Sequence, residues 1–231
     1  MSKTKRVLLS WSTGKDCAWS LHLLRQRTDV EVVALVTTFN SAVNRVAMHA
    51  VRHRLVEAQA SRTGLPLWSV GLPWPCSNAD YEARMLGVCE RANAEGIDAV
   101  AFGDLFLEDV RAYRERQMRD TGLELLFPAW GIPTGQLARD MIAAGIKAKL
   151  TCIDPSKLAP SFAGRDFDRA LLNALPPGTD PCGENGEFHT FVCDAPVFAQ
   201  PIAVHTGEIL ERDGFVFADV IPVTDFTEPQ A

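Results

Sequence analysis

The feature that most constrains this 231-residue chain is a regular alternation of apolar runs with amphipathic helical segments. Five apolar runs predict strands at residues 6–11, 30–37, 66–70, 99–102 and 123–127. Between them, apolar positions spaced three and four apart predict helices over residues 15–25, 47–61, 78–94 and 108–120. This alternation predicts an α/β fold with a Rossmann-like, doubly wound parallel sheet, whose ligands bind outside the carboxyl ends of the strands.

The pattern changes after Trp130. A helix is predicted at residues 134–144, a strand at 147–153, helical spacing over 167–174, and two short extended pieces at 204–210 and 215–223. A turn-rich stretch lies between the last helix and these pieces. We therefore expect two domains without a flexible linker, a nucleotide-type domain over 1–128 and a smaller α+β domain over 129–231.

The composition is that of an ordinary globular protein, with 47% hydrophobic and 23% charged residues. No apolar run approaches the 18 or so residues of a membrane helix, so we expect no membrane span. The basic start precedes only a short apolar run, which favours a first strand over a signal peptide. Six cysteines without a C-x-x-C pair indicate reduced thiols, a cytoplasmic location and no structural zinc site.

Charge is unevenly distributed. The net charge is −6, yet the first 62 residues carry ten Lys and Arg against four Asp and Glu. An acidic chain with a basic first quarter suits a local anion site better than a nucleic-acid surface. We therefore expect no nucleic-acid partner.

The first strand-to-helix turn contains Ser12–Asp16, with a glycine followed by a lysine. This is not a Walker A loop, because Leu9 stands where that motif needs its first glycine. Asp16 follows Lys15 where the motif needs a magnesium-binding hydroxyl. The stretch has one glycine, Gly14, so it also fails the G-x-G-x-x-G pattern.

The same turn has the elements of an anion site. Small residues let successive amides converge on an anion at a helix N-terminus. Ser12 and Thr13 add hydroxyl donors, Lys15 adds a positive charge, and Asp16 can cap the helix or approach magnesium. The alternative is a simple capped βα turn, in which Ser, Thr, Gly and Asp are also common.

A second stretch, CGENGEFHTFV at residues 182–192, places two carboxylates on a tight turn that leads into a strand. Gly183 and Gly186 flank Glu184, Glu187 follows, and strand alternation would place Glu187 and His189 on one face. Such carboxylates could hold magnesium, orient an amine or act as a base. The alternative is a solvated acidic hairpin.

Ser12–Asp16 resembles the SGGKDS-type PP-loop of the N-type ATP pyrophosphatases. Thr13 stands for the first glycine and Cys17 for the final serine. In that superfamily the loop holds the pyrophosphate end of ATP, and the reaction takes place at the α-phosphate.

Residues 183–190 are similar to the EGGEFET-type motif of the diphthine–ammonia ligase family, a branch of the PP-loop proteins. Asn185 replaces a glycine and His189 replaces a glutamate. The pair Gly103-Asp104 after the fourth strand and the run 128–130, similar to P-L-W, extend the resemblance over most of the chain.

The resemblance implies an ATP- and Mg²⁺-dependent ligase. Such an enzyme adenylates a carboxylate and lets ammonia displace AMP, which forms an amide. It implies ATP-phosphate binding by Ser12, Thr13, Gly14, Lys15 and Asp16, with Gly103 and Asp104 beside the nucleotide. It implies Glu184, Glu187 and Lys15 as catalytic residues, and Asp16 as a magnesium ligand. For substrate binding we expect Gly183, Gly186, His189, Thr190 and His49.

Several functional alternatives stay open. The acceptor is either protein-borne diphthine or a small-molecule carboxylate, and a homodimer is compatible with the sequence. A PP-loop enzyme that thiolates a tRNA base would favour paired cysteines and a basic surface, and neither is present. A regulatory protein that senses ATP without turnover would need only the first motif.

Two further groups of side chains receive a structural interpretation. His49 and His53 are spaced like a metal pair, but they lie among arginines, so we favour a basic helix edge. Charges alternate along the predicted fourth helix, which indicates a solvated face for Arg111, Arg114, Arg116 and Arg119.

Overall fold

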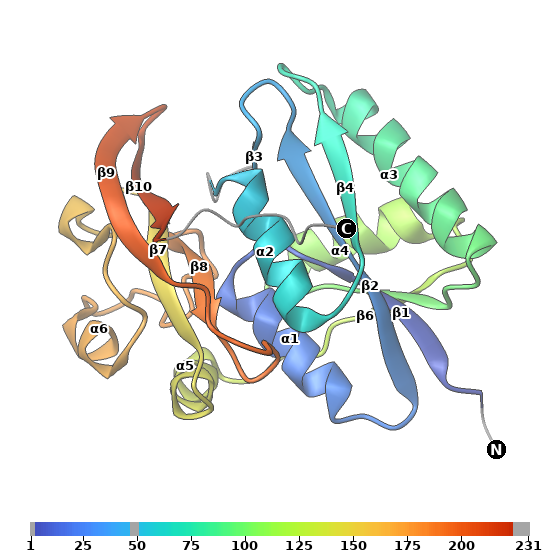
Figure 1. Ribbon diagram of the computed structural model, residues 1–231, viewed down its shortest axis with the longest axis horizontal. Coiled ribbons are helices and arrows are strands. Elements are labelled where there is room, and N and C mark those ends of the chain that lie inside the picture. The colour runs from blue at the N-terminus through green and yellow to red at the C-terminus, as the bar shows by residue number, and fades with distance from the viewer. Residues whose placement is uncertain (1–2, 47–50, 224–231) are drawn as a thin grey trace.

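The computed structural model describes residues 3–46 and 51–223, which form two β-sheets with their covering helices (Figure 1). The helices are α1 (Lys15–Arg25), α2 (His53–Thr63), α3 (Asn78–Ala94), α4 (Glu108–Met118), α5 (Thr134–Ala143), α6 (Arg169–Ala174) and the 3₁₀ turn η1 (Pro160–Phe162). Sheet A contains β1 (Lys5–Ser10), β2 (Val30–Asn40), β3 (Arg45–Val46), β4 (Leu67–Leu72), β5 (Ala99–Ala101) and β6 (Glu124–Leu126). Sheet B contains β7 (Lys147–Ile153), β8 (Phe188–Asp194), β9 (Val204–Arg212) and β10 (Phe215–Pro222).

Sheet A has the predicted doubly wound topology. Its parallel strands lie in the order β4-β2-β1-β5-β6, and the short β3 pairs with the end of β2 in the antiparallel sense. The chain moves from β1 to β2 on one side, whereas β5 lies on the other side of β1. The carboxyl end of β1 is therefore at a topological switch point, where open α/β sheets bind ligands.

The alternation of side chains along β1 explains the two helical layers. Val7 and Leu9 pack in a core that includes α1 and α2, whereas Leu8 packs in a second core with α3 and the end of α4. Because successive strand residues point to opposite faces, a central strand with three consecutive buried apolar residues needs apolar cover on both faces.

Sheet B is antiparallel, in the order β8-β7-β10-β9, and packs on the side of sheet A that α1 and α2 cover (Figure 1). Leu150, Phe191 and Val216 of sheet B belong to the same buried cluster as Val7 of sheet A. The Rossmann-like sheet followed by a smaller α+β region is thus confirmed. The domain boundary between residues 128 and 129 stays a prediction.

The predicted helix over residues 47–61 is wrong at its start. Residues 47–50 lie outside the described residues, and the helix itself begins at His53, after Arg52 in extended conformation. Two backbone hydrogen bonds hold this stretch in a hairpin-like arrangement, from Val46 N–H to the Val51 carbonyl and from His53 N–H to the Asn44 carbonyl. These cross-strand bonds are incompatible with helical bonding at Val51 and Arg52.

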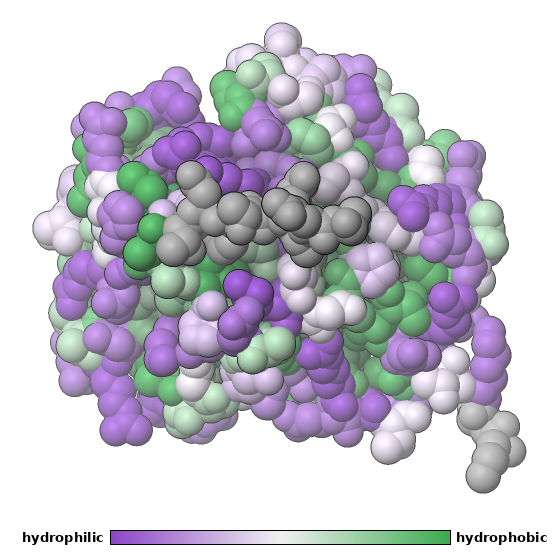
Figure 2. Space-filling view, viewed as in Figure 1, coloured by the Kyte–Doolittle hydropathy of each residue, from purple (hydrophilic) through white to green (hydrophobic). Residues whose placement is uncertain are grey.

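Within the described residues, every helix is too short or too polar to cross a membrane. On the face of the molecule in Figure 2, hydrophobic residues occur in small, separate groups among hydrophilic ones, as is usual for a water-exposed surface. All six cysteines are free thiols, as predicted.

Candidate active site

The Ser12–Asp16 loop joins β1 to α1. Gly14 is the N-cap residue, in extended conformation, so the N-cap position itself supplies no side-chain hydrogen bond to the helix. Thr13 has a φ of +76°, in the left-handed region that a β-branched residue rarely adopts. The loop therefore has, at Thr13, a backbone conformation that glycine, the residue of the SGGKDS-type motif at this position, adopts more easily. Cys17, at the serine position, donates its thiol to the Gly14 carbonyl at 3.0 Å.

Strand β8 of sheet B is hydrogen-bonded directly to this loop. The Thr13 carbonyl accepts a hydrogen bond from Val192 N–H at 3.0 Å, and Lys15 N–H donates to the Thr190 hydroxyl at 3.1 Å. The Gln59 amide, on α2, donates to both the Thr13 and the Val192 carbonyls. The two sequence motifs, 175 residues apart at Lys15 and Thr190, thus form one structural unit.

The Lys15 side chain is almost completely buried between the two motifs, with 2% exposed. Its ammonium donates to the Cys182 carbonyl and pairs with the Asp16 carboxylate at 2.9 Å. The rings of Phe188 and Phe167 lie 5.4 and 5.6 Å from the same nitrogen. The other Asp16 carboxylate oxygen, Oδ1, is buried and has no hydrogen-bond partner among the described residues.

The turn that carries the second motif is held by Asp180. Its carboxylate accepts hydrogen bonds from the backbone N–H groups of Cys182 at 2.9 Å and Glu184 at 3.1 Å, and from the Thr134 hydroxyl. Gly183 has a φ of +70°, and a Cβ there would lie 2.8 Å from the Phe188 carbonyl oxygen. Only glycine fits this position, which explains its place in the motif.

The two glutamates of the motif point to different partners. Glu187 is buried and turns back into its own loop, where Oε1 accepts hydrogen bonds from Asp180 N–H at 2.9 Å and from the Asn185 side chain at 3.2 Å. Glu184 reaches across to sheet A and accepts a hydrogen bond from Leu105 N–H at 2.7 Å. Gly186, with a φ of +81°, completes the turn between them.

Gly103 and Asp104 lie where β5 meets the start of α1. A Cβ on Gly103 would lie 3.0 Å from the Cys17 amide nitrogen, so glycine permits this close approach. Asp104 forms an ion pair with Arg114 of α4, whose guanidinium also lies 4.2 Å from the centre of the Phe102 ring. Arg114 is therefore not on a solvated face, and that prediction is wrong.

Burial shifts the pKa of several side chains in this region, among them Glu184 and His189. It raises the pKa of Glu184 from 4.5 to about 7, an effect that the Leu105 N–H opposes and the negative charges of Asp16 and Asp104 reinforce. Burial also lowers the pKa of His189 from 6.5 to about 4, so this histidine is neutral near pH 7. A carboxyl that titrates near neutrality can accept or release a proton during a reaction.

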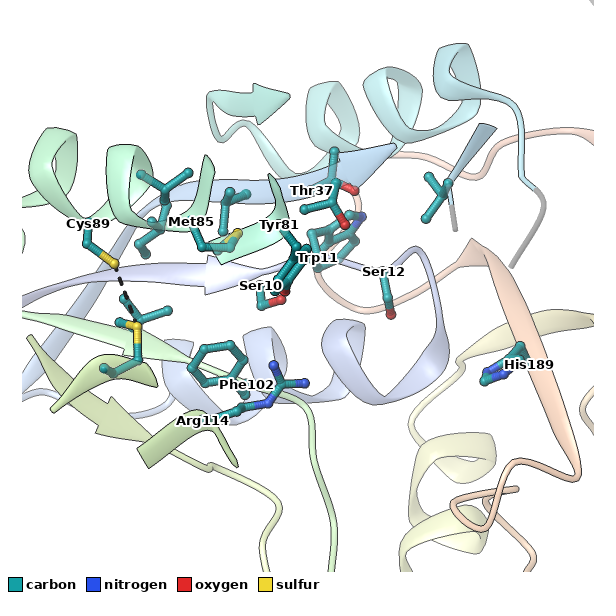
Figure 3. A pocket seen from close by; sticks show the side chains of 17 residues that line it. Ser10, Trp11, Ser12, Thr37, Tyr81, Met85, Cys89, Phe102, Arg114 and His189 are labelled. Atoms are coloured by element: carbon teal, nitrogen blue, oxygen red, sulfur yellow. Dashed lines mark hydrogen bonds between the residues drawn. The ribbon is translucent and has the colours of Figure 1, made fainter. Parts of the chain in front are cut away.

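A cavity of about 260 Å³ begins beside Ser12 and runs along β1 between sheet A and helices α3 and α4. Figure 3 shows Ser10, Trp11 and Thr37 near its middle, Arg114 beside Phe102, and His189 reaching in from β8. Its inner part is apolar, with Met85, Cys89 and Met118 among the residues that line it. None of the described residues lining it is a carboxylate.

The structure brings together most of the predicted site residues, in two groups. Ser12 and His189 line the cavity, whereas Lys15, Glu184, Glu187 and Thr190 lie at the interface between the motifs. His49 falls outside the described residues. Sequence reasoning missed Gln59, Asp180 and Arg114 as site residues. Gln59 contacts Val192, 133 residues away in the chain, whereas Asp180 contacts Glu184 and Arg114 contacts Asp104, four and ten residues away. For Asp180, the signal in the sequence was its position, two residues before Cys182 and the start of the second motif.

Comparison with known families identifies both parts of the chain. The family model for the diphthamide synthase N-terminal domain matches residues 5–125, and the model for the C-terminal domain of the same enzyme matches residues 133–219. This chain belongs to the diphthamide synthase family. The resemblance that the two motifs indicated is thus confirmed.

Individual members of the diphthamide synthase family show the same relationship. A diphthine–ammonia ligase of Rattus norvegicus is 30% identical over 131 residues, which are 54% of this chain and 49% of that protein. The one from Schizosaccharomyces pombe is 26% identical over 227 residues, 90% of this chain and 37% of that protein. The one from Bos taurus is 26% identical over an alignment of 243 positions, which covers 93% of this chain and 88% of that protein. The chain thus spans about half or less of the rat and fission-yeast relatives.

Proposed function

We propose that this chain is an ATP-dependent ligase that joins ammonia to a carboxylate and releases AMP and pyrophosphate. The observation that carries the proposal is the direct hydrogen bonding between the Ser12–Asp16 loop and β8, which continues the Glu184 turn. Such an arrangement would bring nucleotide and acceptor to one point, which a transfer reaction requires and an ATP sensor does not.

ATP is the substrate that suits the cavity beside Ser12. The cavity lies at the switch point of sheet A, has an apolar inner part for a purine, and has Arg114 as its charged lining residue. The absence of carboxylates among the described lining residues favours a polyanion. The Ser12 hydroxyl and the amides of the first turn of α1 that follow Lys15 would then bind the phosphates.

Mg²⁺ fits the same site as a partner of ATP. The described residues contain no group of three acidic, histidine or cysteine side chains arranged around a metal. Asp16, however, offers the buried oxygen Oδ1, which lacks a hydrogen-bond partner among those residues. Magnesium is usually held by one or two carboxylates together with substrate phosphates, so Asp16 would supply the protein's ligand. The ion would neutralise charge on the pyrophosphate.

The reaction would take place in two steps. An oxygen of the acceptor carboxylate attacks the α-phosphorus of ATP, and the bond to pyrophosphate breaks, which leaves an acyl-adenylate. The nitrogen of ammonia then attacks the acyl carbon, the bond to AMP breaks, and the nitrogen loses a proton. Glu184, with its pKa near 7, would accept that proton. Burial of the interface would protect the acyl-adenylate from water.

The proposal for the acceptor is supported by the relatives, which are diphthine–ammonia ligases. We propose protein-borne diphthine as the acceptor, with a small-molecule carboxylate as the alternative. The free thiols of all six cysteines support a reducing, cytoplasmic setting. We also propose the domain boundary near residue 128, supported by the separate family matches on either side of it.

The test is to incubate the protein with ATP, magnesium and ammonium against a panel of carboxylates that includes a diphthine-bearing elongation factor. We expect AMP and pyrophosphate in equal amounts, only with the correct acceptor. Release of ADP would overturn the assignment. Glu184→Gln should bind ATP normally and form little amide. Nucleotide binding without any acceptor-dependent release would favour the sensor.

A further inference from the structure

The Lys15 ammonium is directed away from the cavity and toward sheet B. Lys15 is not among the residues that line the cavity, although it follows Gly14 directly. Its ammonium instead lies among the Cys182 carbonyl, the Asp16 carboxylate and two phenylalanine rings. A lysine that bound the phosphates of ATP would have to leave all of these partners.

Leaving them would be unfavourable. A buried ammonium is tolerated only where it is paired and hydrogen-bonded, and its removal would leave the Cys182 carbonyl without its charged donor. The Asp16 carboxylate would lose its only ion pair among the described residues. The present contacts of Lys15 are therefore a stable arrangement that does not need a nucleotide.

These contacts connect three backbone segments: the start of α1, the Cys182–Glu184 turn and the segment from Gly103 to Leu105. From the start of α1, Lys15 bonds to Cys182, and two residues later Glu184 bonds to Leu105 N–H. Leu105 lies two residues after Gly103, and Gly103 packs directly against the start of α1. The Lys15 bond is the connection that joins the Cys182–Glu184 turn to the helix.

From this geometry we infer that Lys15 is a positioning residue, whose ammonium holds the Cys182–Glu184 turn so that Glu184 reaches Leu105, rather than a ligand of the ATP phosphates. This inference rests on the proposed function for its effect on turnover. Its structural part, the coupling of Lys15 to the Leu105 amide, is independent of any reaction.

The test compares Lys15→Met with the unsubstituted protein in three measurements. Hydrogen exchange of the Leu105 amide, without ATP, should become at least about tenfold faster, because Glu184 no longer holds it. The Kd for a non-hydrolysable ATP analogue should change less than about threefold, since no phosphate contact is lost. Acceptor-dependent pyrophosphate release should fall about 100-fold, as expected for a misplaced reacting group.

Two further variants make the result decisive. Lys149→Met is the matched control. Lys149, like Lys15, is a mostly buried lysine in an ion pair, with Asp166 at 2.8 Å, but none of its ion pairs among the described residues is with the Cys182–Glu184 turn. It should leave all three measurements unchanged. Gly183→Ala displaces the turn and leaves the Lys15 side chain unsubstituted. It should therefore change the three measurements in the same way as Lys15→Met, and it takes the place of Lys15→Met if the latter does not fold.

Two results for Lys15→Met would overturn the inference. One is an unchanged hydrogen-exchange rate of the Leu105 amide. The other is a Kd for the ATP analogue raised at least about tenfold, as expected when a charged hydrogen bond to the ligand is lost. If the unsubstituted protein neither binds the analogue nor releases pyrophosphate, the proposed function fails. The coupling between Lys15 and Leu105 would then still be decided by hydrogen exchange alone.

Discussion

At the scale of single residues, Thr13 has the least favourable conformation for its type. Its φ of +76° disfavours a β-branched side chain, and its buried hydroxyl has no hydrogen-bond partner among the described residues. Its carbonyl nevertheless accepts the hydrogen bond from Val192 that joins the loop to sheet B. The strain is therefore maintained by contacts on both sides of the loop.

Thr13→Gly should raise the free energy of unfolding by about 1 kcal/mol, because relief of the strained backbone and the unpaired hydroxyl exceeds the entropy cost of glycine. Denaturant unfolding measures the change. Thr13→Ala removes the hydroxyl but keeps the unfavourable φ, so its stability should lie below that of the glycine variant. A glycine variant less stable than the unsubstituted protein would show that Thr13 is not strained.

Glu184 should make stability depend on pH. Its pKa in the folded chain, about 7, exceeds the ordinary 4.5, so folding favours the protonated form. The resulting stabilisation is complete below pH 4.5 and is lost as the pH rises through 7. At 1.36 kcal/mol per pKa unit, reduced for partial exposure, the loss should be about 1–2 kcal/mol.

Glu184→Gln should remove this dependence. Unfolding free energies measured between pH 4.5 and 8 should therefore fall more steeply for the unsubstituted protein than for the variant. Parallel curves for the two proteins would mean that the Glu184 carboxyl is not desolvated in the folded state.

At the scale of the elements, the segment that follows β5 approaches the start of α1 closely at Gly103. In Gly103→Ala the new Cβ would meet the backbone of Asp16 and Cys17 at 3.1 and 3.0 Å, so one of the two elements must shift. We expect a loss of about 1–3 kcal/mol in stability and weaker ATP binding. Calorimetric titration with an ATP analogue, together with thermal unfolding, measures both.

Gly87 is the matched control for this substitution. It lies within α3, and a Cβ there would meet nothing within 4 Å. Gly87→Ala should leave ATP binding unchanged and raise stability by about 0.5–1 kcal/mol, because alanine favours a helix. Equal effects of the two substitutions would show that the Gly103 contact has no special role.

At the scale of the whole molecule, one buried cluster runs from sheet A through α1 and α2 into sheet B. The bonds of Thr13, Lys15 and Gln59 to β8 cross the same interface, and Asp219 of β10 forms ion pairs with Arg45 and Arg52. Two sheets that share a core are expected to unfold together.

We therefore predict a single unfolding transition. All five tryptophans lie between residues 11 and 130, so their fluorescence reports on sheet A and its surroundings, whereas far-ultraviolet circular dichroism reports on both sheets. The two signals should change at the same denaturant concentration. Two separate midpoints would mean that the sheets are independently stable.

The sequence by itself determined the type and order of most elements. The predicted bounds of α1, α3 and β7 agree with the structure, and α3 begins with a capping box formed by Ser77 and Asp80. Helical and strand periodicity, caps and turns depend on residues close together in the chain, so local patterns are enough to predict them. The same local signals located the loop at the carboxyl end of β1.

Only the tertiary structure decided what each site residue contacts. The Lys15 side chain bonds to a carbonyl 167 residues away, and Glu184 bonds to an amide 79 residues away. The Arg114 guanidinium pairs with Asp104 and lies over the Phe102 ring. Val51 and Arg52 leave the predicted helix because of backbone bonds to the preceding strand. Burial and pairing across such separations follow from how the sheets pack, which no local pattern encodes.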